Sequence, residues 1–137
     1  MNNLIENDIV GTIGTKKYHC TIKWHNGTFI MDEPINVGGN DEGPDPYTTL
    51  LAALAGCTLS TLRMYIDRKG WIIPEINVQL NMTQETDPQI VTTIKREISF
   101  SGDVTGEQKD RLLTIATKCP VSKILEHKIV LNNIIRP

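Results

Sequence analysis

The sequence predicts an α+β fold in which antiparallel sheet packs around one long central helix. Three observations support this prediction. Residues 45–70 form a long helical stretch, Asn26-Gly27 marks a hairpin turn, and residues 76–83 and 90–100 alternate apolar and polar side chains on either side of a short polar turn. The predicted order of elements is β-β-β-α-β-β-α-α-β. Because neighbouring strands are joined mostly by hairpins, antiparallel sheet is favoured over a doubly wound parallel sheet.

Length and composition are those of an ordinary globular protein. The 137 residues predict a single domain over positions 1–137, and the net charge of -2 gives no indication of a nucleic-acid or anionic-membrane partner. The first residues, MNNLIENDIVG, lack the basic and apolar regions of a secretory signal. We therefore expect a cytoplasmic protein with reduced thiols, in which Cys20, Cys57 and Cys119 need individual explanations.

The N-terminal part predicts short strands around a hairpin. Cys20 falls on the apolar face of the second strand, where a small core residue is expected. The strands are expected at residues 8–14, 17–24 and 28–33.

A loop at residues 34–45 follows, with three glycines, two prolines and three acids. Loops next to a rigid element often carry function, so Asp41 and Glu42 are candidate functional acids. Solvated carboxylates are the simpler interpretation of both.

The long helix has clear end signals. Asp45 is a good N-cap, Pro46 fits the first helical position, and Gly70 suits the left-handed residue that ends a helix. Residues 50–55 are apolar on every side, so a soluble helix of this kind must be surrounded by protein. A membrane span is the competing interpretation, but it requires about 20 predominantly apolar residues. Threonine and serine interrupt this run and Arg63 bounds it, so a buried helix is favoured.

Arg96 lies on the apolar face of the strand predicted at residues 90–100, where a lone arginine is costly unless it is paired. One interpretation places its guanidinium in a site beside the central helix. The other, slightly favoured, is a side chain at the rim of the sheet or paired with Glu75 or Glu85.

Two helices and a strand are expected after this hairpin. Thr105 and Gln108 form a capping box for a helix that ends at Lys118. A short helix from Cys119 to Glu126 has Pro120 in its first position, and residues 127–135 predict a final strand.

Two of the cysteines differ in their local chemistry. Cys119 sits where the N-terminal amides of a helix point, which lowers the pKa of a thiol, whereas a mid-helix apolar position raises the pKa of Cys57. Two thiols can form a peroxide-reducing pair when one is oxidised to sulfenic acid and the other condenses with it. This requires Cα atoms within roughly 7 Å, and the sequence leaves that open.

Two segments resemble the OsmC/Ohr family, named for osmotically inducible protein C and the organic hydroperoxide resistance protein. They are GPDPYTTLLAALAGCTLSTLRMYIDRKGW at residues 43–71 and KCPVSKIL at residues 118–125. The order of sheet, central helix, hairpin, helix and second cysteine agrees over nearly the whole chain. The resemblance implies a single OsmC-like domain and an intertwined homodimer with antiparallel sheets packed around the central helices.

The resemblance also implies an activity. In catalytic members the cysteine of the central helix, here Cys57, attacks an organic hydroperoxide, and the cysteine of the CPVS-like turn, here Cys119, resolves it as a disulfide. No bound cofactor is expected, and an external dithiol of the dihydrolipoamide type restores the thiols.

This chain departs from the family pattern beside the nucleophile. Tyr47 replaces the family glutamate at the start of the central helix, and no arginine precedes Arg63. Glu42 or Arg96 could supply the missing activation of Cys57.

Two other hypotheses compete with this activity. An OsmC-like dimer without catalysis would bind a small apolar ligand in the interfacial cleft. A zinc site at the three cysteines has no supporting ligand spacing.

Overall fold

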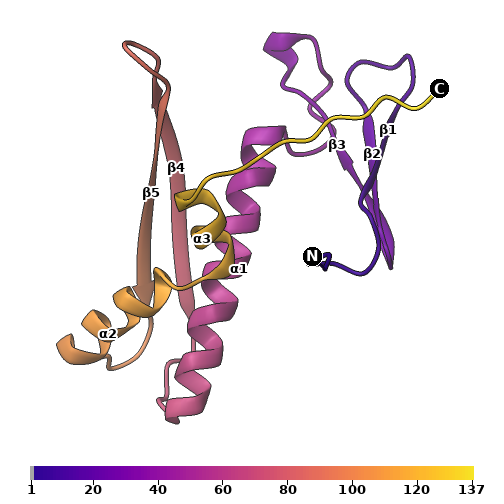
Figure 1. Cartoon of the computed structure of the whole chain (residues 1–137). Coiled ribbons are helices and arrows are strands. Elements are labelled where there is room, and N and C mark those ends of the chain that lie inside the picture. The colour runs from indigo at the N-terminus through magenta and orange to yellow at the C-terminus, as the bar shows by residue number, and fades with distance from the viewer. Residues whose placement is uncertain (1) are drawn as a thin grey trace. The chain divides into compact units, whose positions relative to one another are not determined.

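The computed structural model describes residues 2–137, and its elements are shown in Figure 1. The chain divides into two compact units, one up to Leu50 and one from Leu51 onward. Each unit is described by itself. Both contain antiparallel strands, and together they have three α-helices, so the α+β prediction is confirmed.

The first unit contains a three-stranded antiparallel sheet with the order β1-β2-β3. Its hairpin turn is formed by His25 and Asn26, one residue earlier than predicted, because Gly27 already pairs with Trp24. A Cβ at Gly27 would lie 2.8 Å from the Trp24 ring, so glycine is needed there for close packing. Cys20 is half-buried on this sheet. The elements are β1 (Val10–Ile13), β2 (Cys20–Trp24), β3 (Gly27–Met31) and a 3-10 turn at Ile35–Val37.

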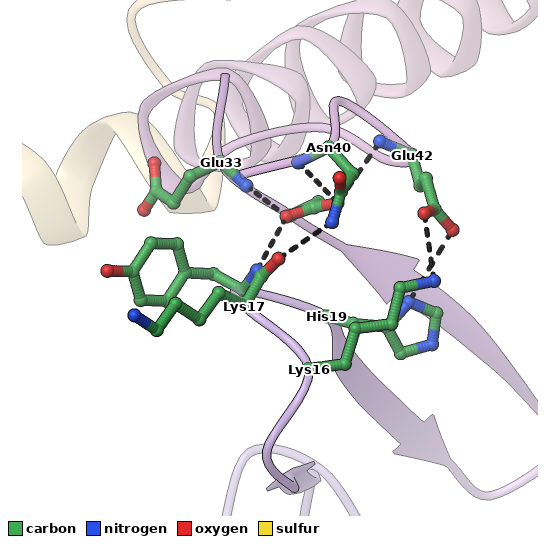
Figure 2. A network of polar contacts seen from close by, with 8 residues as sticks. Lys16, Lys17, His19, Glu33, Asn40 and Glu42 are labelled. Atoms are coloured by element: carbon green, nitrogen blue, oxygen red, sulfur yellow. Dashed lines mark hydrogen bonds and ion pairs between the residues drawn. The ribbon is translucent and has the colours of Figure 1, made fainter. Parts of the chain in front are cut away.

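The backbone of the predicted loop is hydrogen-bonded to Asp32, a residue that the sequence pattern did not single out. Its side chain is 2 % exposed and accepts four backbone N–H groups, and the donor residues Glu33, Asn40 and Glu42 are labelled in Figure 2. The donors are Tyr18 at 3.0 Å, Glu33 at 2.7 Å, Asn40 at 3.3 Å and Glu42 at 3.2 Å. Burial raises the pKa of Asp32, but these hydrogen bonds outweigh it and lower the pKa below its ordinary value.

The second unit consists of the long helix, a two-stranded antiparallel ribbon and two shorter helices (Figure 1). Its core joins the C-terminal half of the long helix to the ribbon and to the second helix, with Leu62, Ile66 and Leu112 completely buried. The elements are α1 (Pro46–Lys69, which begins in the first unit), β4 (Ile76–Glu85), β5 (Val91–Phe100), α2 (Gly106–Ala116) and α3 (Pro120–Glu126).

The helix ends follow the sequence signals closely. The Asp45 carboxylate accepts the Thr48 amide at 3.2 Å, and Gly70 has a φ of 67°, the left-handed conformation expected after α1. The capping box of Thr105 and Gln108 is present in both directions. Helix α2 ends at Ala116, two residues before the predicted end.

The prediction that α1 is buried all round is wrong for the single chain. Its buried residues form one stripe: Leu54, Thr58, Leu62, Tyr65 and Ile66. Leu50 and Met64 are 42 % and 66 % exposed, because the elements of one chain cover only one side of the helix. By length and composition alone, α1 is also able to cross a membrane.

The predicted strand at residues 127–135 does not form. The alternation is typical of a strand, but residues 128–137 pair with no strand among the described residues. A strand needs a neighbour for its backbone groups, and periodicity does not show whether one chain supplies it. Five large apolar side chains of this segment are exposed: Ile129, Val130, Leu131, Ile134 and Ile135.

Candidate redox site at a cysteine pair

The second unit brings Cys57 and Cys119 together. Cys57 lies in the middle of α1 and Cys119 directly precedes α3, and the two thiols are close enough for each to shift the pKa of the other. Both are free thiols, with Cys119 buried and Cys57 half-buried. The Val121 amide of α3 also donates to Cys57 Sγ at 3.5 Å. Cys57 therefore lies beside the first turn of α3, which Cys119 caps.

Cys119 is the N-cap of α3, the position usually taken by serine, threonine, aspartate or asparagine. Its backbone is extended, with φ -62° and ψ 135°, and Pro120 follows in the first turn as predicted. Cys119 Sγ accepts the Ser122 amide at 3.4 Å and lies 3.2 Å from the Ser122 hydroxyl. The thiol thus replaces the usual capping oxygen.

The Arg96 side chain extends from β5 to Thr58 and Ser122, the residues next to the two cysteines. Its Nη1 donates to Thr58 Oγ1 at 2.8 Å and to Ser122 Oγ at 2.9 Å. Of the two interpretations drawn from the sequence, the hydrogen bonds agree with the guanidinium beside the central helix. The slightly favoured pairing with Glu75 or Glu85 is wrong. The Arg96 side chain extends from β5 toward α1 and α3, where the hydroxyl groups of Thr58 and Ser122 accept hydrogen bonds from its guanidinium.

The pKa values of the two thiols diverge. Burial raises the pKa of Cys119, but hydrogen bonds from the Ser122 hydroxyl and amide, with those to Cys57 and Thr58, bring it down to about 7. Burial raises the pKa of Cys57, the Val121 amide lowers it in part, and neighbouring Cys119 raises it further, so that it ends above its ordinary value. This agrees with the order expected from the helix positions.

An open cavity of about 200 Å³ lies beside the pair on the Arg96 side. Arg96, Ser122 and Glu126 give it a polar part, and Leu54, Ile94 and Leu125 give it an apolar part. Neither cysteine is among its lining residues. The cavity has room for a small molecule with one polar and one apolar end.

Glu42 has different partners. It belongs to the first unit, where it forms an ion pair with Lys16 Nζ at 2.9 Å and lies 3.8 Å from His19 Nδ1 (Figure 2). Tyr47, at the start of α1, is 69 % exposed. Cys57, Cys119 and Arg96 thus come together within one unit, whereas Glu42 is held by contacts within the other.

Thr58 and Ser122 are site residues that the sequence reasoning missed. Both are buried, at 0 % and 4 % exposure, and both accept a hydrogen bond from Arg96. A signal was present in each case. Thr58 is a polar residue directly after Cys57 on an apolar helix. Ser122 stands three residues after the N-cap Cys119, a position whose side chain faces the cap.

The comparisons with known proteins agree with this architecture. A family model described as OsmC-like protein matches residues 38–132. No curated protein matches the chain in sequence.

Several solved structures share the fold. A Psychrobacter arcticus protein named for osmotic stress induction and detoxification response is 18% identical, with a TM-score of 0.75 over 90% of this chain and 91% of that one. An organic hydroperoxide resistance protein of Elizabethkingia anophelis is 23% identical, with a TM-score of 0.68 over 90% of each chain. The organic hydroperoxide resistance protein OhrB of Bacillus subtilis is 20% identical, with a TM-score of 0.63 over 89% of this chain and 91% of that one.

Proposed function

Because the chain belongs to the family of OsmC-like proteins, we propose that it is a thiol-dependent peroxidase that reduces organic hydroperoxides through Cys57 and Cys119. The observation that carries the proposal is the hydrogen bond from the Val121 amide to Cys57 Sγ at 3.5 Å, which places Cys57 beside the first turn of the helix that Cys119 caps. Structural relatives that are named for organic hydroperoxide resistance support the choice of substrate.

The proposed reaction has two steps in the protein. The Cys57 thiolate attacks the terminal oxygen of the hydroperoxide, the O–O bond breaks, and the alkoxide leaves and takes up a proton as the alcohol. The Cys119 thiolate then attacks the sulfenic acid on Cys57, forms the disulfide and releases hydroxide, which is protonated to water. Cys57 is the nucleophile in this scheme because it is half-buried, whereas Cys119 is 0 % exposed.

A dithiol from solution is proposed to return both cysteines to the reduced state. It donates two electrons and two protons to the disulfide through a mixed disulfide and becomes oxidised itself. A compound of the dihydrolipoamide type has this chemistry. The scheme requires reduced thiols at rest, which fits the cytoplasmic location that we propose.

We propose a homodimer as the working form. The exposed apolar side chains Leu50 and Met64 on α1, and the apolar segment after α3, support it, since both leave hydrophobic surface uncovered in the single chain. The same contacts would complete the burial of α1 that its sequence predicts. A non-catalytic dimer that binds a small apolar ligand is not favoured, because such a protein has no use for two neighbouring thiols.

The test is disulfide mapping. Reduced protein is treated with one equivalent of cumene hydroperoxide or hydrogen peroxide, and its disulfides are mapped by mass spectrometry. We expect a rapid Cys57–Cys119 disulfide, faster with the organic peroxide, that is absent in Cys57→Ser and unchanged in the matched control Cys20→Ser. Thiols that stay free under excess cumene hydroperoxide would refute the proposed activity.

A further inference from the structure

The hydrogen atoms around Cys119 can be assigned from donor and acceptor chemistry. Arginine carries donors and no acceptor, so Thr58 and Ser122 must both accept from Arg96 Nη1. The Thr58 hydroxyl hydrogen is directed to the Leu54 carbonyl oxygen, at 2.7 Å. The Thr58 hydroxyl therefore already donates one hydrogen bond and accepts another. Its contact with Cys119 Sγ, at 4.0 Å, is weaker than either of these.

Ser122 is in a different position. Its oxygen accepts from Arg96, so its own hydrogen is free, and Cys119 Sγ lies 3.2 Å away in the direction of an acceptor. The Ser122 amide donates to the same sulfur at 3.4 Å. Cys119 Sγ thus faces two donors of one residue, and this is the environment of a thiolate. Cys57 Sγ accepts the Val121 amide at 3.5 Å, and the Thr61 hydroxyl also lowers its pKa, but burial and the neighbouring Cys119 outweigh both and leave the pKa raised.

We propose that Arg96 is a positioning residue that, through the Ser122 hydroxyl, keeps the negative charge of the resting cysteine pair on Cys119 and its one proton on Cys57. Cys119 then serves twice. It is the base that takes the proton from Cys57 before attack, and it is the thiolate that resolves the sulfenic acid afterwards. The two roles of Cys119 as base and as resolving thiolate rest on the proposed function, whereas the placement of the proton on Cys57 does not.

The proton balance closes with one proton in the pair. Transfer from Cys57 to Cys119 produces the Cys57 thiolate, which attacks the hydroperoxide and expels the alkoxide. The alkoxide takes the proton from Cys119 and leaves as the alcohol, so the Cys119 thiolate is restored just when the sulfenic acid has formed. Its attack on Cys57 then forms the S–S bond and releases hydroxide.

The groups that surround Cys119 support this direction. The titratable group beside it is Cys57 on α1, and the cation that acts on it through Ser122 is Arg96 on β5. Glu126 on α3 lines the cavity beside Arg96, and its carboxylate acts in the opposite direction. The pKa of Cys119 at about 7 and the raised pKa of Cys57 place the proton in the same way.

The placement of the proton can be measured without any peroxide. Protein labelled with 13C at cysteine Cβ is titrated by NMR, and each resonance is assigned with single Cys→Ser variants. We expect Cys119 to titrate at lower pH than Cys57, and the Cys119 midpoint to rise by about one pH unit or more in Arg96→Gln and in Ser122→Ala. Arg96→Lys keeps a donor and a charge, so its midpoint should fall between native and Arg96→Gln.

Lys95→Gln is the matched control. It removes a positive charge from the next residue of β5, but Lys95 is exposed and pairs with Glu97 at 2.8 Å, so the Cys119 midpoint should not move. The proposal is overturned if Cys57 titrates first, or if Ser122→Ala and Arg96→Gln leave the Cys119 midpoint at its native value. Ser122→Ala keeps the measurement decisive if Arg96→Gln does not fold.

A second measurement tests Cys119 as the base. Oxidation of Cys57 by cumene hydroperoxide, followed by sulfenic-acid trapping at different pH values, should have its midpoint near pH 7 in the native protein, at the pKa of Cys119. In Cys119→Ser the midpoint should move up to that of Cys57 alone. A cysteine that only resolves would leave the midpoint in place, which would overturn this half. Complete absence of Cys57 oxidation would instead refute the proposed function and leave the NMR result standing.

Discussion

Replacing Thr58 by valine tests the contact between α1 and Arg96 at almost constant side-chain shape. Thr58 is 0 % exposed, and its hydroxyl is one of two acceptors for Arg96 Nη1. A hydrogen bond to a charged group contributes about 1.5–3 kcal/mol, and Arg96 is only half-buried, so we expect a loss of about 2 kcal/mol in Thr58→Val. For 137 residues this corresponds to a decrease in Tm of roughly 7 °C.

Two matched variants separate the hydroxyl from the methyl group. Thr58→Ser keeps the acceptor and loses one buried methyl, which costs about 1 kcal/mol, so it should be more stable than Thr58→Val. In an Arg96→Met background the order should reverse, because no guanidinium is left without a partner. Thr58→Val should then cost less than about 0.5 kcal/mol.

The assay is urea unfolding at a fixed protein concentration, since association would make stability depend on concentration. The free energy of unfolding is compared for native protein, the single variants and the double variants. Equal stability of Thr58→Val and native protein, or an equal effect of Thr58→Val in both backgrounds, would refute the importance of this hydrogen bond.

Three further predictions concern other parts of the chain. Leu112 is completely buried in the core, so Leu112→Ala should lower the free energy of unfolding by about 3 kcal/mol, measured beside the exposed control Leu113→Ala. In Asp32→Asn one side-chain oxygen is replaced by a donor, so hydrogen exchange of the amides of Tyr18, Glu33, Asn40 and Glu42 should accelerate; unchanged exchange would contradict the role of Asp32. Because folding lowers the pKa of Asp32, the stability that its carboxylate contributes is fully present above the ordinary pKa of 3.8 and is lost as the pH falls through the lowered pKa of the folded state. Native protein should therefore lose protection of these amides under acid conditions. Asp32→Asn should show little change in protection over the same pH range. Gly39→Ala should disrupt the same loop, since a Cβ there would collide with the Glu33 carbonyl oxygen, and an unchanged heteronuclear NMR spectrum would contradict this.

The sequence determined the local elements because their signals are themselves local. The hydrogen bond from the Thr48 amide to Asp45, the left-handed Gly70 and the reciprocal cap of Thr105 and Gln108 each depend on residues within a few positions of one another. The opposite tendencies of the Cys57 and Cys119 thiols could also be predicted, because the position of each in its helix governs its surroundings.

The tertiary structure decided what depends on partners far away in the chain. No pattern along β5 indicates that Arg96 meets Thr58, 38 residues away, and Ser122, 26 residues away. The Asp32 carboxylate likewise accepts hydrogen bonds from amides that lie before and after it in the chain, which no local pattern indicates. Residues 127–135 alternate like a strand, but this alternation does not supply the neighbouring strand that pairing requires. Periodicity reports which face of an element is apolar, but the atoms that cover this face come from the rest of the fold.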